Sequence, residues 1–295
     1  DAADAGSAPV GTAQYEPPPG ALFVSPAGNN DHSGGADDPL RTIKAAIKRA
    51  VPGGAIVLRA GEYHEKITIP EGKPLTIQSY PGEAAWLDGS TVVEGWATDG
   101  EHWSAPWDLV FDSSPTYSRG ASDNDEEHWQ FINPEHPMAA HPDQVWVDDA
   151  PLRQAATSDE VDEGSFYFDE ASSRLILGVD PTGHVIRASA LQRALSIRAE
   201  GTTIRGIGIH RYAPSVPDLG AITIERPGVT FENVVVAENA TTGLFVTAAK
   251  TTLRNVTVVQ NGMIGIAANY ADEFIVESVK SSDNNTEWFN KAPVA

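Results

Sequence analysis

Short apolar segments separated by turn residues make up much of the chain. Segments at 55–59, 66–69, 75–79 and 85–88 are rich in Ile, Val, Leu and Thr, and apolar residues recur in them mostly at every second position. Gly, Pro and Glu fill the intervals. Alternation with period two predicts strands that turn one face toward a core. The first part of the chain is therefore predicted to consist of short strands joined by tight turns.

One segment, 39–50, has helical periodicity. Its apolar residues fall on one face of a helix: Ile43, Ala46, Ile47 and Ala50. Thr42 is a suitable N-cap, and Gly53 is a suitable stop signal. One short amphipathic helix ahead of many strands needs an apolar surface to cover. We expect it to cap the open end of a β-helix core.

Residues in the last third of the chain repeat at a spacing of 22. The sets are Phe231, Leu253 and Ile275; Asn233 and Asn255; Asn239, Asn261 and Asp283; and Gly243 and Gly265. About 22 residues with three short strands make one coil of a parallel β-helix, in which equivalent residues stack about 4.8 Å apart. Because Asn tolerates left-handed backbone, the set that begins at Asn239 is predicted to form a polar ladder at one corner.

The middle of the chain has a different pattern. Strand signals at 144–148, 164–169, 174–179 and 185–187 are separated by turn residues, which predicts antiparallel hairpins. The whole chain then divides into four parts. They are a flexible N-terminal tail at 1–20, a cap with the first coils at 21–94, an inserted antiparallel β subdomain at 95–192, and further coils at 193–295 that we expect to continue beyond 295.

The motifs FVSPAGN at 23–29, DPLRTI at 38–43, PGGAIV at 52–57 and AGEY at 60–63 follow one another in order. As a set they resemble the opening of pectate-lyase-like right-handed parallel β-helix proteins. These are secreted polysaccharide lyases and glycosidases, and the chain resembles their N-terminal portion. The resemblance implies an all-β fold, a right-handed parallel β-helix with an N-terminal capping helix and an inserted antiparallel β subdomain. It also implies carbohydrate chemistry.

Charge and composition narrow the partners. The chain has 20 Lys and Arg against 41 Asp and Glu, a net charge of −21, which would repel nucleic acid and anionic membrane surfaces. It has no cysteine and no apolar run long enough to span a bilayer. The Ala-, Gly- and Pro-rich start is typical of a mature chain after leader removal, so we expect a secreted, extracellular protein. A second chain or a missing C-terminal segment is expected to complete the last coil.

A candidate site follows from the loop lengths. Long loops at 210–220 and 284–294 flank short turns at 240–242 and 262–264, which predicts a valley about two strand spacings, or roughly 10 Å, wide. That width suits a polysaccharide or oligosaccharide. The candidate catalytic carboxylates are Asp218, Glu238 and Glu287. The candidate substrate-binding residues are Tyr212 and Trp288 for stacking on sugars, and His210, Arg211 and Lys291 as bases or charge neutralisers.

Several alternatives stay open at this stage. No metal site is predicted and no cofactor is expected, although the acidic run at 123–127 offers oxygen ligands to calcium without an EF-hand pattern. The acidic balance favours a neutral glycan and a glycoside hydrolase, whereas family frequency favours a polysaccharide lyase. The alternative to an enzyme is a non-catalytic glycan-binding or adhesin-like β-helix. A purely structural solenoid is the third hypothesis.

Overall fold

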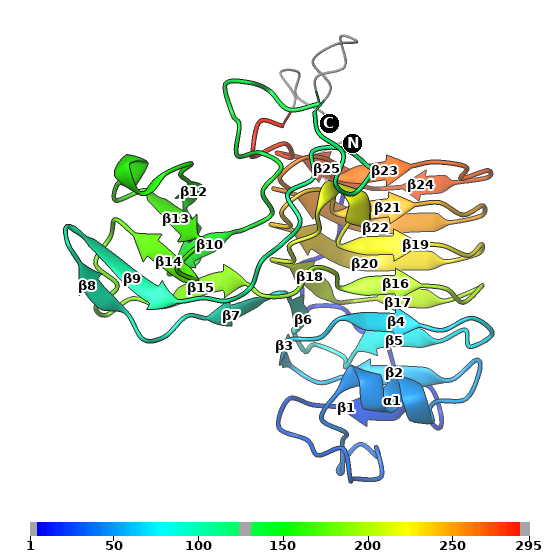
Figure 1. The fold of residues 1–295 in the computed structure, drawn as a ribbon. Helices are drawn as coiled ribbons and strands as arrows, with labels where there is room; N and C mark the ends of the chain where they lie inside the picture. The colour runs from blue at the N-terminus through cyan, green and yellow to red at the C-terminus, as the bar shows by residue number, and fades with distance from the viewer. Residues whose placement is uncertain (1–4, 124–130, 290–295) are drawn as a thin grey trace.

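The computed structural model describes residues 5–123 and 131–289, and its architecture is an all-β parallel β-helix (Figure 1). Its parallel strands form three faces, of which the first two are joined into one sheet by the long strands β20 (Thr230–Ala237) and β22 (Thr252–Val259). The first holds β1 (Leu22–Val24), β2 (Ala55–Leu58), β5 (Thr76–Ser79), β17 (Thr203–Arg205), the first halves of β20 and β22, and β24 (Ile275–Glu277). The second holds β3 (Gly61–Tyr63), β6 (Ala85–Asp88), β18 (Gly208–His210), the second halves of β20 and β22, and β25 (Lys280–Ser282). The third holds β4 (Ile67–Ile69), β16 (Leu195–Ile197), β19 (Ile222–Ile224), β21 (Leu244–Val246) and β23 (Ile266–Ala268).

Two asparagines turn the long strands from the first face to the second. Asn233 in β20 and Asn255 in β22 have φ values of 49° and 51°, in the left-handed region. Asn occupies this region more readily than most residues, because its short polar side chain bonds locally to the backbone. The pair detected in the repeat therefore marks a corner of the coil.

Apolar side chains stack inside the solenoid from coil to coil. Ile56 pairs in register with Ile77, Ile77 with Ile204, Ile204 with Phe231, and Phe231 with Leu253, and each is almost completely buried. This ladder removes a continuous apolar column from water, which supplies the main stabilisation of the fold. The next residue in the column, Val276, is 53% exposed, because no further coil lies over it among the described residues.

The polar ladder forms, but its third residue differs from the prediction. Asn239 Nδ2 donates to Asn261 Oδ1 at 2.9 Å, and Asn261 Nδ2 donates to Asn284 Oδ1 at 2.9 Å. The repeat lengthens to 23 residues in the last coil, where Leu253 pairs with Val276. That extra residue moves Asn284 into the corner position that the 22-residue spacing assigned to Asp283.

The predicted helix forms as α1 (Ile43–Arg49) at the N-terminal end of the stack (Figure 1). The Thr42 side chain accepts a hydrogen bond from Ala45 N at 3.2 Å, as an N-cap should. Ile43, Ala46 and Ile47 are buried against β1, β2 and β4. In the part of the chain that the structure describes, no helix has the length and apolar character needed to cross a bilayer.

Two further sheets are inserted between β6 and β16 and form a lobe beside the solenoid (Figure 1). One sheet orders β11 (Ala150–Pro151), β10 (Val145–Val147), β15 (Ile186–Ser189) and β7 (Ser90–Val92), all antiparallel. The other orders β12 (Arg153–Gln154), β13 (Ser165–Asp169), β14 (Arg174–Leu177), β9 (His102–Pro106) and β8 (Ala97–Asp99), antiparallel except at β12. Phe166, Leu175 and Leu177 belong to its own core. We call these two sheets the inserted lobe. It leaves the solenoid at the corner between the second and third faces.

Residues 5–20, whose composition predicts flexibility, lie against the solenoid. Gly6 N donates to Ser278 O at 2.8 Å, and Ser7 N donates to Thr257 Oγ1 at 2.9 Å. Further along, the backbone carbonyl of Tyr15 accepts from Gln78 Nε2 at 2.8 Å. This segment therefore spans several coils, from the last one toward the first.

Candidate functional site

A row of side chains lies at the corner beside the inserted lobe. The row consists of Arg211, Glu238, Gln260 and Asp283, each with a φ between 54° and 61°, and the last three each lie directly before a ladder residue. The left-handed backbone repeats at the same place in successive coils, which lie about 4.8 Å apart. The chain turns toward the third face at this position. Backbone geometry thus places a line of polar side chains along one edge of the solenoid.

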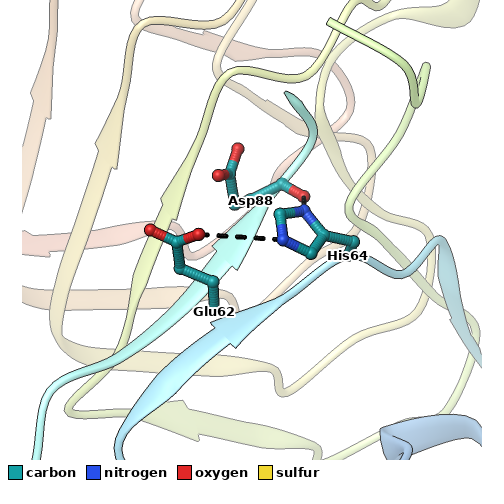
Figure 2. Close-up of side chains that lie close together, drawn as sticks. All are labelled: Glu62, His64 and Asp88. Atoms are coloured by element: carbon teal, nitrogen blue, oxygen red, sulfur yellow. Dashed lines mark hydrogen bonds and ion pairs between the residues drawn. The ribbon is translucent and has the colours of Figure 1, made fainter. Parts of the chain in front are cut away.

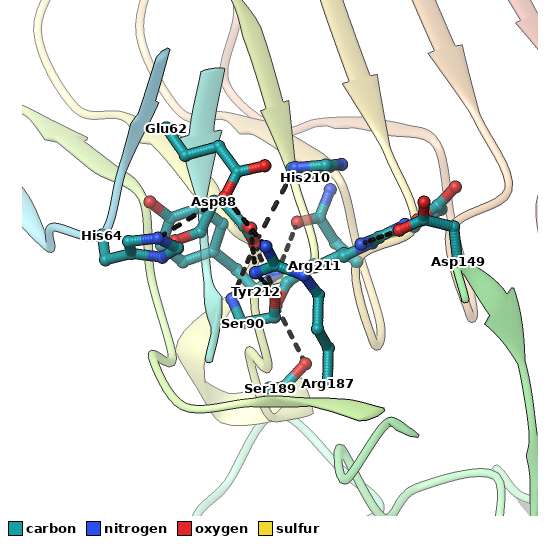
Figure 3. A network of polar contacts seen from close by, with 12 residues as sticks. Glu62, His64, Asp88, Ser90, Asp149, Arg187, Ser189, His210, Arg211 and Tyr212 are labelled. Carbon is teal, nitrogen blue, oxygen red and sulfur yellow. Dashed lines mark hydrogen bonds and ion pairs between the residues drawn. The ribbon is translucent and has the colours of Figure 1, made fainter. Parts of the chain in front are cut away.

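Arg211 joins this row to the inserted lobe (Figure 3). Its Nε donates to Glu238 Oε2 and its Nη1 donates to Asp149 Oδ1, both at 2.8 Å. The guanidinium also lies 5.0 Å from the centre of the Trp146 ring. Since two carboxylates already pair with Arg211 and its side chain is buried, the predicted role of Arg211 as a free charge neutraliser is not supported. Its geometry instead fixes the carboxylate of Glu238.

A cavity of about 520 Å³ lies between the row and the inserted lobe. Its solenoid side includes Glu238, Glu287 and Trp288, and its lobe side includes Trp146, Asp149 and Arg153. We call it the corner pocket. Three of the residues predicted from sequence therefore come together here. The second wall is the inserted lobe, not the loop at 210–220.

Glu287 is a partly buried carboxyl group in the corner pocket. Burial raises the pKa of Glu287 above its ordinary value, and no described residue gives its carboxylate a hydrogen bond or an ion pair. A Cβ atom built on Gly262 would lie 1.8 Å from Ala240 O and 3.0 Å from Glu287 Cγ. Glycine at 262 is therefore required where this turn packs against the backbone of Ala240 in the preceding coil, beside the Glu287 side chain.

Trp288 presents an aromatic surface at the mouth of the pocket. Its side chain is 53% exposed, and its ring stacks on His136 with centroids 5.9 Å apart and an interplanar angle of 18°. An exposed indole held by a second ring loses little conformational freedom when it binds a ligand. Stacking on a sugar ring is consistent with this geometry.

The structure corrects the prediction for Tyr212. The side chain is fully buried in the solenoid core, and its hydroxyl donates to Glu65 O at 2.9 Å. Burial also raises the pKa of the Tyr212 phenol. The ring has no face open to a sugar, because it packs among the apolar side chains of the solenoid core.

Asp218 does not line the corner pocket. Its Oδ2 accepts from Ser215 N at 3.0 Å and from Ser215 Oγ at 2.7 Å, so that it completes the capping of the 3₁₀ helix η3 (Val216–Asp218). Its Oδ1 lies 3.2 Å from Arg119 Nη2 and 3.8 Å from Arg193 Nη2. These contacts give Asp218 a structural role in the loop. Lys291 lies outside the described residues.

His210 belongs to a separate polar cluster, where the lobe meets the solenoid (Figure 3). Its ring centroid lies 4.6 Å from that of Trp86, and its Nε2 lies 3.8 Å from Asp88 Oδ1. Burial lowers the pKa of His210. We find no contact that places it in the corner pocket among the residues described.

Glu62, His64 and Asp88 form the centre of this cluster, with one potential ligand atom of each within 4.8 Å of the others (Figure 2). Arg187 of β15 already bonds both carboxylates, to Glu62 Oε2 at 3.1 Å and to Asp88 Oδ2 at 3.3 Å. The guanidinium supplies the positive charge that a cation would bring. The cluster is thus an ion-pair network that ties the inserted lobe to β3 and β6.

The acidic run at 123–127 is the other candidate cation site. Only Asp123 falls in the described part of the chain. Its carboxylate accepts from the backbone N–H of Phe131 at 2.8 Å and of Ile132 at 3.2 Å. The other four residues of the run lie outside the described residues, so calcium binding stays a prediction.

The residues on the lobe side of the corner pocket were not predicted from the sequence. Trp146, Asp149 and Arg153 sit on or beside short strands whose alternation predicts an inner and an outer face, but not which outer face meets the solenoid. The positive φ values of Asp148 and Asp149, at 47° and 69°, mark a tight turn in this region. The Asp-Asp-Ala-Pro sequence there was the available signal, and it indicates a turn without indicating a site.

No protein-family model matches the chain. Pectate lyase PEL9 of Emericella nidulans is 28% identical over 173 residues, which cover 55% of this chain and 39% of that protein. The solved structure of XylC with xylose superposes with a TM-score of 0.73 at 12% identity, over 91% of this chain and 54% of XylC. A solved glycoside hydrolase superposes with a TM-score of 0.62 at 12% identity, over 91% and 74%. The chain spans less than half of the curated relatives that it matches and about half of XylC.

Proposed function

Since the chain folds as a pectate-lyase-like parallel β-helix, we propose that it is the N-terminal part of a secreted carbohydrate-active enzyme. The reaction class is a glycoside hydrolase or a polysaccharide lyase acting on an extracellular glycan. The corner pocket is the proposed substrate site. The observation that carries the proposal is the presence of an exposed indole and two differently held carboxyl groups, Glu238 and Glu287, in one cavity.

The two carboxyl groups suit complementary roles. Glu287 is partly buried without a partner, so its raised pKa favours the protonated form that a general acid needs. Glu238 is held in place by the Arg211 guanidinium, whose Nε lies 2.8 Å from its Oε2, so its carboxyl group is positioned for the role of base or nucleophile. Glycosidases use such a pair on either side of the scissile bond.

Non-catalytic glycan binding is the second candidate function. The observation that favours it is the pairing of Glu238 with Arg211, because a carboxylate held in an ion pair can be a structural group alone. The stacked Trp288 and His136 rings would bind a sugar without any proton transfer. Turnover of a bound glycan separates the two functions.

We also propose that further chain, from the same protein or a second one, covers the last coil. Ile275 is 46% exposed and Val276 is 53% exposed, whereas Leu253, the register partner of Val276 in the preceding coil, is fully buried. Neither β23 nor β24 has a strand on its outer side among the residues that the structure describes. Unpaired strand edges of this kind invite pairing.

The test is binding and turnover on a glycan panel with Trp288→Ala. Loss of the stacking surface is expected to weaken sugar binding about tenfold, since an aromatic contact contributes about 1–1.5 kcal/mol. Tyr270→Ala is the matched control, because Tyr270 is 91% exposed and does not line the corner pocket. Isothermal titration and reducing-end assays measure the two effects.

Equal affinity of wild type and Trp288→Ala for every bound glycan would contradict the assignment of the pocket. Binding without any release of product would favour the non-catalytic function.

A further inference from the structure

We propose that the substrate is an uncharged oligosaccharide that lies across two joined cavities, and that Glu287 protonates the glycosidic oxygen of the bond between them. This inference rests on the proposed function of the corner pocket and deepens it. It names the substrate class, the reaction and the position of the cleaved bond relative to one residue.

The geometry begins with a second cavity of about 330 Å³ beside the corner pocket. Its lining includes Glu135, Gln154 and Glu160, none of which lines the corner pocket. Three residues line both cavities: His136, Arg153 and Glu287. Glu287 therefore stands at the boundary between the two, where a chain that occupied both would pass.

The volumes fit a ligand longer than one sugar. The two cavities, at about 520 and 330 Å³, each fall in the range of roughly 300–1,000 Å³ that is typical of small-molecule sites. A single monosaccharide would fill only one of them. An oligosaccharide with units on both sides of Glu287 uses the whole groove.

The charges in the groove disfavour a uronate. Five carboxyl groups line the two cavities: Glu135, Asp149, Glu160, Glu238 and Glu287. Against them stands Arg153, whose Nη2 already lies 3.6 Å from Asp162 Oδ2. Arg211 is buried behind the pocket and is bonded to two carboxylates. Among the described residues that line the two cavities, a polyuronate would meet one arginine against five carboxyl groups, so its own carboxylates would be repelled.

An uncharged substrate decides the reaction. Elimination by a lyase requires a carboxylate next to the carbon that loses its proton, and an uncharged sugar has none. Hydrolysis requires only an acid and a base. Glu287 gives its proton to the glycosidic oxygen as the C1–O bond breaks, and the bonding electron pair stays on that oxygen. Water supplies the oxygen that bonds to C1, and its proton passes to the carboxylate of Glu238 and then to solvent.

The burial of Glu287 is consistent with this role. A carboxyl group without a hydrogen bond or an ion pair retains its proton to a higher pH than an exposed glutamate does. Its position at the shared wall gives it access to both cavities. A purely structural glutamate would be expected to have a partner.

The experiment compares wild type, Glu287→Gln and Glu94→Gln on two kinds of substrate. The first kind is a panel of neutral oligosaccharides and aryl glycosides of neutral sugars, with good and poor leaving groups. The second is polygalacturonate. Glu94 is exposed and lies outside both cavities, so its substitution is the matched control. Thermal unfolding of each variant checks that the fold is retained.

The expected result is turnover of a neutral oligosaccharide that Glu287→Gln reduces by about 10²–10⁴-fold. The loss should be much smaller for an aryl glycoside with a good leaving group, which departs without a proton. The alkaline limb of the pH profile should disappear in Glu287→Gln. A merely structural role for Glu287 would change neither the leaving-group dependence nor that limb.

The contrary results are distinct. Cleavage of polygalacturonate to unsaturated products overturns the substrate class and the reaction, while the proposed carbohydrate activity stands. Turnover of a neutral glycan that Glu287→Gln leaves unchanged overturns the role of Glu287 alone. A protein that neither binds nor alters any glycan of the panel overturns the proposed function and this inference together.

Discussion

Asp143 illustrates how one buried carboxyl group sets a local pH dependence. Burial raises the pKa of Asp143 to about 6, and its Oδ1 has no hydrogen-bond partner in the described part of the chain. Its neighbour Gln144 lines the corner pocket and donates to Glu238 O at 3.3 Å. In the unfolded chain an aspartate ionises near pH 3.9. Between pH 4 and 6 the folded protein therefore holds a proton that the unfolded chain has lost.

Asp143→Asn should raise the free energy of unfolding more at pH values above 6 than it does at pH 4. The folded state binds more protons than the unfolded state, so the wild-type contribution is fully present below about pH 4. This contribution is lost as the pH rises to about 6, and the free energy of unfolding of the wild type then falls by about 2–3 kcal/mol. The measurement is the free energy of unfolding of both proteins from pH 4 to pH 8. A difference between them that does not vary with pH would contradict the raised pKa.

At the scale of the element, the asparagine ladder connects successive coils at the corner. Asn261 Oδ1 accepts from Asn239 N at 3.2 Å and from Asn239 Nδ2 at 2.9 Å, while its own amide donates to Asn284. Asn239 and Asn261 are completely buried. Each amide satisfies polar groups that water cannot reach, so the ladder has no dispensable member.

Asn261→Ala is expected to lower the free energy of unfolding by about 2–4 kcal/mol, because it leaves buried donors of Asn239 unsatisfied. Asn269→Ala is the matched control. It replaces an exposed asparagine of the same coil and should change stability by no more than about 0.5 kcal/mol. Denaturant unfolding measures both. Equal effects of the two substitutions would show that the ladder does not stabilise the coil.

Much of the solenoid is predictable at this scale, because each coil repeats the same inward positions. The stacking of Phe231 on Leu253 follows directly from their spacing of 22 residues. The assignment of Asp283 to the ladder fails because the last coil has one residue more, inserted between β23 and β24, where Tyr270 has a φ of 56°. A single insertion changes no apolar pattern strongly enough to be visible in the sequence.

At the scale of the whole molecule, Arg187 couples the inserted lobe to the solenoid. It reaches from β15 to Asp88 on β6 and to Glu62 on β3. Asp88 is fully buried, and its carboxylate also accepts hydrogen bonds from the backbone N–H and the hydroxyl of Ser90. Removing the guanidinium would leave a buried carboxylate without a counter-charge, which is far more costly than losing a surface ion pair.

Arg187→Met should therefore destabilise the protein by about 3 kcal/mol. The equivalent substitution Arg198→Met breaks only an exposed pair with Glu225 and should cost less than about 1 kcal/mol. The double substitution Asp88→Asn with Arg187→Met should recover part of the loss, because it removes the buried charge as well. Denaturant unfolding compares the three proteins. A cost for Arg187→Met no larger than for Arg198→Met would refute the coupling role.

The candidate site is less predictable than the fold, because its two walls come from distant parts of the chain. Glu238, Glu287 and Trp288 were identified from loop lengths along one edge of the solenoid. Which side chains of the inserted lobe line the site depends on the orientation of that lobe against the coils. The sequence repeat carries no information about that orientation. The prediction for Tyr212 was wrong because the sequence places this tyrosine in a long loop, where a sugar-stacking residue would be expected. The sequence alone does not show that its side chain is buried.

The contacts of residues 5–20 determine when, during synthesis of the chain, this segment can reach its native position. Ser7 bonds to Thr257, 250 residues further along the chain. Synthesis at about 5–20 residues per second separates these two residues by roughly 12–50 s. During that interval the coils between them can form while the N-terminal segment still has no partner. Residues made early therefore reach their native positions late, once the coil that receives them has left the ribosome.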